Sequence, residues 1–254
     1  MRGFIAFTKK EFMEQLRTSK CLILMAVFFL FGMTSPLLAK LMPVILSQME
    51  LQGVKIVLPD PTVVDAYGQF FKNCTQMGML VLLLVFGGIL TNELMSGTLI
   101  NILAKGLGRP TVILSKYLAA VTLWTVSYLL AAVVDYGYTS FLFDDYKVSN
   151  LLFSLFCLWL FGCFLLSLIL LSSTLVTGNF GGLTFTVIII AAMFLINLLP
   201  DTARFNPITL ASENVALLTG GVKVEDFLVT ILMTLILTVI SLVGAVAGFQ
   251  RKAL

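Results

Sequence analysis

Long runs of apolar residues, separated by short polar segments, dominate the chain. A helix needs about 20 mostly apolar residues to cross the hydrocarbon core of a bilayer. Because the runs are continuous and do not alternate with polar residues, a membrane β-barrel is excluded. The pattern therefore predicts an all-α integral membrane protein with six transmembrane helices. We expect these spans at Leu22–Ala39, Cys74–Leu90, Thr111–Val134, Leu151–Thr174, Gly181–Leu199 and Phe227–Phe249.

The first 20 residues combine apolar and charged side chains at helical spacing. The apolar ones, near one face, are Phe4, Ile5, Phe12 and Leu16, and Arg17 is among the charged ones. This pattern predicts an amphipathic helix lying in the inner membrane interface. A membrane anchor without a mechanical role is equally compatible with it.

The outer segments are less regular. We expect residues 41–73 to form a long loop without a domain of its own, because Pro and Gly interrupt it repeatedly. Residues 200–226 form an extracellular segment, in which the stretch Ile208–Leu218 fits either a short re-entrant helix or an ordinary loop helix. The whole chain, 1–254, is then a single transmembrane domain.

Composition supports the membrane assignment. The chain is 59% hydrophobic and 11% charged, whereas a soluble domain is about 45–50% apolar and about 25% charged. With both termini in the cytoplasm, ten of the 16 Lys and Arg residues and three of the 13 acidic residues lie on the inner side. This distribution follows the positive-inside rule. It predicts a multi-pass protein of the bacterial cytoplasmic membrane with both termini inside.

Residues that carry enzyme chemistry are scarce. The chain has no His and no phosphate-binding loop, so we expect no catalytic residue, no metal site and no ATP bound by this chain. The four cysteines are expected to be free thiols, and no basic run indicates nucleic-acid binding. Lys40, Lys116 and Asp135 lie near span ends. We expect both lysines to extend to the interface and Asp135 to contact water.

The inner segment Thr91–Pro110, together with Lys116, carries the most specific motif. It places an acid just after the second span, then Gly-Thr-Leu, a short apolar helix, an Arg, and a Lys in the third span. In this order the sequence resembles the permeases of type-2 ATP-binding-cassette exporters. The stretch Lys105–Gly108 departs from the Pro-containing stretch usual before the Arg.

The resemblance implies a division of labour between this chain and its partners. It implies two permeases, here a homodimer, and two copies of a separate ATPase subunit that binds ATP and Mg²⁺, with lipids around the permeases. Residues 92–110 would be the cytoplasmic coupling segment that touches the ATPase. The implied coupling residues are Glu93, Gly97, Thr98, Leu99, Leu103 and Arg109. The second and fifth spans would line the substrate path, with Thr75, Gln76, Thr184, Thr186 and Asn197 as candidates.

A carboxylate at the membrane edge is costly unless it is paired. We therefore expect Glu93 to pair with a cation among Arg17, Lys20, Arg109 and Lys116, although a solvated carboxylate is equally compatible with the sequence.

The leading hypothesis is an exporter of an amphipathic peptide or a hydrophobic small molecule, with the peptide-toxin export or immunity kind as the expected subfamily. A non-transporting immunity or anchoring subunit is the alternative. A channel is a third hypothesis. It is disfavoured because the sequence shows no charged residues that would form a ring around a pore.

Overall fold

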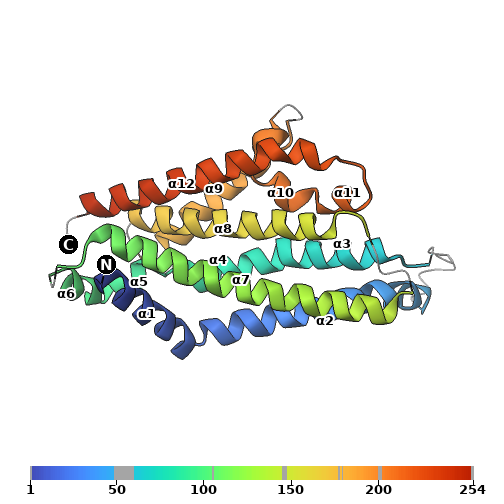
Figure 1. Cartoon of the computed structure of the whole chain (residues 1–254), viewed down its shortest axis with the longest axis horizontal. Helices are drawn as coiled ribbons and strands as arrows, with labels where there is room; N and C mark the ends of the chain where they lie inside the picture. The colour runs from blue at the N-terminus through green and yellow to red at the C-terminus, as the bar shows by residue number, and fades with distance from the viewer. Residues whose placement is uncertain are drawn as a thin grey trace.

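The computed structural model describes residues 2–48, 60–104, 106–144, 148–176, 178, 180–199 and 202–252. Every regular element in these residues is helical, and the long helices run side by side along the longest axis of the molecule (Figure 1). The elements are α1 (Arg2–Arg17), α2 (Lys20–Gln48), α3 (Val63–Asn73), a π-helical turn (Cys74–Gly78), α4 (Met79–Phe86), α5 (Thr91–Met95), α6 (Thr98–Ala104), α7 (Arg109–Leu142), α8 (Leu151–Leu175), α9 (Gly181–Ile196), α10 (Thr209–Ser212), α11 (Asn214–Leu218) and α12 (Phe227–Arg251), with 3₁₀ turns at Ala203–Phe205 and Val224–Asp226.

Within the described residues, five helical stretches are long and apolar enough to cross a membrane. They are Lys20–Ile45, Val63–Met95, Arg109–Leu142, Leu151–Leu175 and Val224–Arg251. The fifth predicted span, α9, has only 16 residues. At 1.5 Å per residue it is about 24 Å long, shorter than the roughly 30 Å of the hydrocarbon core. The structure therefore has five to six candidate spans in an all-helical membrane protein.

The predicted outer loop is largely helical, which corrects the prediction for residues 41–73. Helix α2 continues to Gln48, with Pro43 inside it, and α3 begins at Val63. Residues 49–59 lie outside the described part of the chain. A capping box begins α3: the Thr62 hydroxyl accepts from the Asp65 backbone N–H at 3.4 Å, and the Asp65 carboxylate accepts from the Thr62 N–H at 2.8 Å.

The second candidate span contains a π-helical turn at Cys74–Gly78, between α3 and α4. A π turn accommodates one extra residue in a helix, and such turns occur often at functional sites. Gly78 belongs to this turn and packs against α2, where a Cβ on it would lie 2.8 Å from Cζ of Phe28. The turn is thus held against its neighbouring helix.

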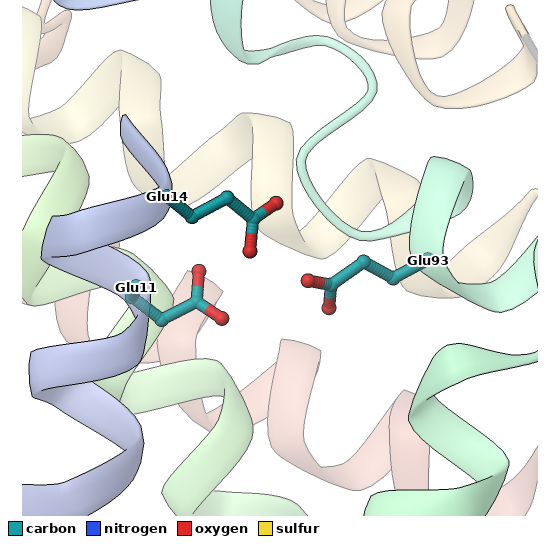
Figure 2. A group of neighbouring side chains, drawn as sticks. All are labelled: Glu11, Glu14 and Glu93. Carbon is teal, nitrogen blue, oxygen red and sulfur yellow. The ribbon is translucent and has the colours of Figure 1, made fainter. Parts of the chain in front are cut away.

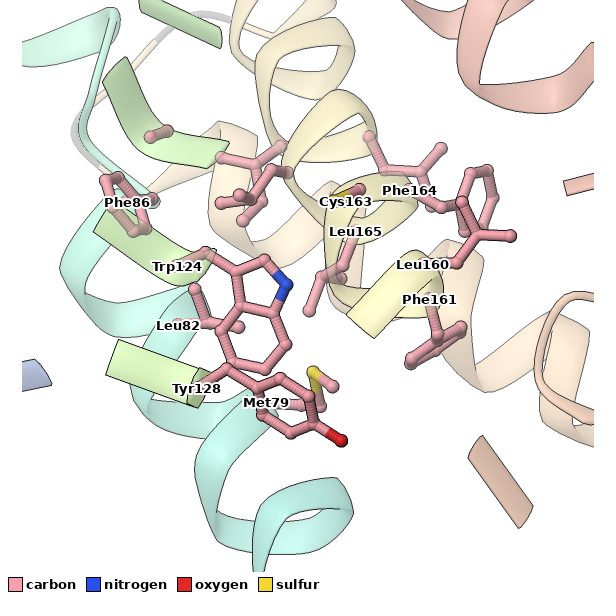
Figure 3. Close-up of a cluster of buried hydrophobic side chains, with 14 of the residues drawn as sticks. Met79, Leu82, Phe86, Trp124, Tyr128, Leu160, Phe161, Cys163, Phe164 and Leu165 are labelled. Atoms are coloured by element: carbon pink, nitrogen blue, oxygen red, sulfur yellow. The ribbon is translucent and has the colours of Figure 1, made fainter. Parts of the chain in front are cut away.

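Helix α8 lies at the centre of the bundle and is buried over most of its length. Figure 3 shows the rings of Trp124 and Tyr128, from α7, between side chains of α4 and α8. These two rings stack with centroids 4.8 Å apart, and the Trp124 indole N–H donates to the Trp159 carbonyl at 3.0 Å. Gly162 makes this possible, because a Cβ there would lie 2.5 Å from Trp124 Nε1.

Helices α2 and α7 run beside each other and touch backbone to backbone. At Gly32 the missing side chain lets α2 approach the carbonyl oxygen of Ala131, which a Cβ would overlap. Small residues permit this kind of close approach between membrane helices.

The segment before the last span folds back onto the bundle. Helices α10 and α11 pack against α8, with Leu210 and Leu217 fully buried, and α11 also contacts α3. Pro200 and Asp201, at the start of the predicted segment, lie outside the described residues. The described part of 200–226 is therefore a packed cap on one end of the bundle.

Candidate functional site

Helix α1 crosses the opposite end of the bundle and packs against α7 (Figure 1). Its inward side carries Phe7, Glu11 and Gln15, which are all buried. Ile5 and Leu16, from the predicted apolar face, are 67% and 69% exposed. The inward side of α1 thus carries two polar groups beside Phe7, while two residues of the predicted apolar face point outward.

The other residues proposed for this apolar face are more covered. Phe4 is 36% exposed and Phe12 is partly buried, while Arg17 ends the helix and is exposed.

A cluster of five charged side chains joins α1, α5 and α7. It consists of Lys10, Glu11, Glu14, Glu93 and Lys116, and we name it the charge cluster. The Lys116 ammonium lies 3.0 Å from Glu11 Oε2 and 2.8 Å from Glu93 Oε2. The Lys10 ammonium lies 2.6 Å from both a Glu93 and a Glu14 oxygen. Figure 2 shows the three carboxylates pointing toward one another from α1 and α5.

The charge cluster is largely buried, so each charge in it depends on its partners for compensation. The side chains of Lys116 and Glu11 are 1% and 3% exposed, and that of Glu93 is 12% exposed. Partial burial alone would lower the pKa of Lys10. Its hydrogen bonds to Glu14 and Glu93, with Glu11 nearby, more than offset burial and raise that pKa. The three carboxylates have ligand atoms within 4.8 Å of one another, and each of them lies within ion-pair distance of one or both of the two ammonium groups.

The structure decides between the two expectations for Glu93. It is paired, and of the four expected partners Lys116 provides an ion pair. Lys10 provides the other, and the sequence analysis missed it. The expectation that Lys116 extends to the interface is wrong, because its ammonium points into the protein, where Glu11 and Glu93 compensate its charge.

The signal for the inward face of α1 was available in the spacing of Phe7, Glu11 and Gln15. Residues four apart lie on one helical face. The prediction was based on the apolar residues Phe4, Ile5, Phe12 and Leu16 and did not identify this second face.

The segment after Glu93 turns sharply and returns to the core. Gly97 has φ of +69°, a conformation that glycine adopts without strain. The Thr98 hydroxyl donates to the Glu93 carbonyl at 3.3 Å. Leu99 is fully buried, and Leu103 packs against the core partly buried. Helices α5 and α6 are thus docked on the bundle beside the charge cluster.

Arg109 begins α7 and holds the end of α12. Its guanidinium donates to the carbonyls of Phe249, Gln250 and Lys252 at 2.7, 2.6 and 3.0 Å. It also lies over the Phe249 ring, 5.6 Å from the centroid. These carbonyls have no partner within an α-helix, and a cation there also complements the helix dipole.

Replacing Arg109 by Gln should loosen the end of α12. We expect a loss of about 1–2 kcal/mol, because a charge-assisted contact to several carbonyls is removed. Hydrogen exchange followed by mass spectrometry should show faster exchange at 248–252 and no change in α8. Arg251→Gln, also at the end of α12 but exposed, is the matched control. Equal exchange in both variants would contradict this role for Arg109.

An apolar cavity of about 620 Å³ lies between the second and fifth predicted spans. Its lining includes Thr75, Gln76 and Leu83 on one side and Leu183 and Phe194 of α9 on the other. At one end the two sides converge, since a Cβ on Gly87 would lie 2.8 Å from Leu183 Cδ1. At the other end the Thr75 hydroxyl donates to the Ala211 carbonyl of α10 at 3.2 Å.

The remaining candidates for the substrate path lie elsewhere. Thr184 is exposed on α9, and Thr186 is buried with its hydroxyl bonded to the Gly182 carbonyl at 2.8 Å. Asn197 accepts from the Thr209 hydroxyl at 3.1 Å. None of the three lines the cavity. The residues of α9 that line the cavity are apolar: Leu183, Val187, Ile190 and Phe194.

Asp135 is also placed differently from the expectation. It was expected to contact water, but it is 1% exposed on the buried side of α7. Helix packing overrides its position near the predicted span end, because α2 and α3 cover this side of α7.

Comparison with known proteins supports the class of protein. No family model matches the chain. It is similar to the uncharacterized transmembrane protein YxlG of Bacillus subtilis (strain 168), with 23% identity over 99% of this chain and 98% of that protein. Similarity over the full length of both chains agrees with the helical architecture, and together they indicate a multi-pass membrane protein.

Proposed function

We propose that this chain is the transmembrane subunit of an ATP-driven exporter of the type-2 ATP-binding-cassette kind. The observation that carries the proposal is the charge cluster, which ties α1 and α5 to the long helix α7 through Lys10, Glu93 and Lys116. Ion pairs thus connect the two ends of the motif that resembles the exporter permeases, Glu93 and Lys116, to each other and to α1. A coupling element has to transmit force, and this one is short, helical and docked.

The connections offer a path for such force. A partner ATPase that pushes on α5 and α6 would move Glu93, and the cluster links Glu93 to α1 and α7. Arg109 links the start of α7 to the end of α12. In this proposal α1, α5, α6 and the end of α12 face the cytoplasm, with α1 in the inner interface and the apolar side of α1 in lipid.

The cavity between the second and fifth predicted spans suggests the cargo. It is lined almost entirely by apolar side chains, with Thr75, Gln76 and Ser212 at its polar edge. Such a lining suits an amphipathic peptide or a hydrophobic small molecule. We propose that a second copy of the chain faces this side, and that ATP and Mg²⁺ bind to the two ATPase subunits.

Co-purification tests the proposal directly. The chain is co-expressed with a lone ATP-binding-cassette ATPase from the same genome, purified by a tag on the permease, and reconstituted in liposomes. A stable complex with ATPase activity is expected. A chain that purifies alone and leaves ATP hydrolysis unchanged would favour the immunity or anchoring alternative.

Glu93→Gln tests the coupling role within that complex. The variant keeps the size of the side chain but loses the charge that Lys10 and Lys116 share. We expect the complex to assemble with its ATP hydrolysis reduced about tenfold or more, a change of about 1.4 kcal/mol or more in the barrier. Glu225→Gln, at an exposed position at the other end of the bundle, should behave as wild type. Full assembly with full ATP-dependent activity in Glu93→Gln would remove the charge cluster from the mechanism.

A further inference from the structure

Asp135 is a buried acidic side chain that the proposed export mechanism does not use. It is 1% exposed, and its Oδ1 atom has no hydrogen-bond partner within the described part of the chain. None of the ion pairs among the described residues includes it. One helical turn further along α7, the Thr139 hydroxyl is also buried without a partner. Two polar atoms without a partner among the described residues therefore lie on one buried side of one helix.

The position of Asp135 along α7 places it near the outer membrane boundary. Lys116 belongs to the charge cluster at the inner end, and Asp135 follows it by 19 residues. At 1.5 Å per residue the two are separated by about 28 Å, close to the thickness of the hydrocarbon core.

A hydrogen-bonded chain leads from the outer end toward the level of Asp135. A cavity of about 440 Å³ near that end is lined in part by Asp65, Gln69 and Lys72. Gln69 donates to Asn73 at 3.2 Å, and Asn73 donates to the Ser35 hydroxyl at 2.9 Å.

Ser35 lies at the same level as Asp135. Gly32 of α2 meets Ala131 of α7. These helices run in the same direction (Figure 1), so one turn further along each brings Ser35 level with Asp135.

Among the described residues, the groups around Asp135 offer no compensating cation. Tyr67 and Cys74 are buried on the neighbouring α3 and π turn, and Tyr128 is buried two turns back on α7. The nearest charged residue of α2 is Lys40, whose ammonium lies 4.8 Å above the Phe143 ring. Helix α8 contributes Cys157, and α12 has no charged residue between Phe227 and Gln250. The cations that face α7 from α1 belong to the charge cluster at its other end.

We propose that Asp135 is a proton-binding site that holds its carboxyl in the acid form at neutral pH and exchanges its proton with the outer side. An unpaired carboxylate buried among helices costs far more than the neutral acid. The acid also presents an O–H that can donate to a neighbouring oxygen, which a carboxylate cannot do. The site is independent of the exporter proposal, since it lies at the other end of α7 from the charge cluster.

Infrared spectroscopy of the purified full-length protein in nanodiscs tests the proposal. The wild type at neutral pH should show the carbonyl stretching band of a buried protonated carboxyl group, and the band should disappear at alkaline pH. The band should be absent from Asp135→Asn and retained in Asp144→Asn, which removes an exposed acid just past the end of the same helix. A wild-type spectrum without this band at neutral pH would overturn the proposal. So would a band that appears only when Na⁺ is withdrawn, because the site would then hold a metal cation.

Thermal unfolding in detergent provides a second readout that uses the wild type itself. If the folded protein keeps a proton that the unfolded chain releases, stability falls as the pH rises through neutrality. Asp135→Asn is nearly isosteric with the neutral acid, so it should fold and lose this part of the pH dependence, while Asp144→Asn keeps it. An unchanged slope in Asp135→Asn would count against the site.

Discussion

Lys116→Met should destabilise the protein more than any other single substitution in the charge cluster. Lys116 compensates both Glu11 and Glu93, and its own side chain is 1% exposed. Removing one partner from a buried ion pair leaves an uncompensated charge, which costs about 3–5 kcal/mol. We expect a matching loss of unfolding free energy, measured by chemical or thermal unfolding in detergent.

The control is Lys9→Met, which removes an exposed lysine of α1 and should leave stability nearly unchanged. Adding Glu11→Gln to Lys116→Met should recover part of the loss, because the orphaned carboxylate is then removed too. If the double variant is as unstable as the sum of the two single variants, the two side chains do not act as a pair.

Gly32→Ala should force α2 away from α7 and cost about 3 kcal/mol. A Cβ at this position would overlap the carbonyl oxygen of Ala131 and lie 3.1 Å from Cβ of Val134. Backbone atoms cannot rotate aside as a side chain can, so the helices have to separate. The added methyl group would otherwise favour the helix by about 1 kcal/mol. Unfolding in detergent and the yield of monodisperse protein measure the effect.

Gly137→Ala is the matched control for this substitution. Gly137 lies within α7, and a Cβ there would meet nothing within 4 Å. The same chemical change should therefore be neutral or stabilise the protein by up to about 1 kcal/mol. Equal losses in both variants would show that backbone propensity, and not helix contact, governs Gly32.

The apolar pattern predicted the class and the centres of the long helices well, and it failed where helices extend beyond the apolar runs. Pro43 and the polar end of α2 suggested a loop, yet the helix continues to Gln48. Contacts with α3 and α7 support the last turns of α2, and the pattern of a single sequence does not contain those contacts. The start of α3 could have been predicted, because the Thr62–Asp65 capping box is visible in the sequence.

The sequence predicted which segment carries the candidate site, but it did not predict which residues of α1 form ion pairs with that segment. The order of residues from Glu93 to Lys116 singled out this segment, but Lys10 and Glu11 lie more than 80 residues before Glu93 in the sequence. Asp135 was expected to contact water and Lys116 to extend to the interface, and both side chains are buried instead. Burial of a charge depends on where its counterion folds, which local spacing does not specify.

The π turn at Cys74–Gly78 has a consequence for how this chain tolerates change in length. The turn holds one residue more than an α-helical turn. The directions in which α3 and α4 present their side chains therefore depend on this extra residue being accommodated in the turn. Deleting a single residue there would convert the turn to α-helical geometry and leave the two halves of the span facing nearly as before, because the π turn already accommodates that residue. A deletion elsewhere between Gln76 and Glu93 would instead rotate one half by about 100° against the other and swing Glu93 away from Lys116. Chains descended from a common ancestor with this one should therefore vary in the length of this span, where they vary at all, by one residue at this turn.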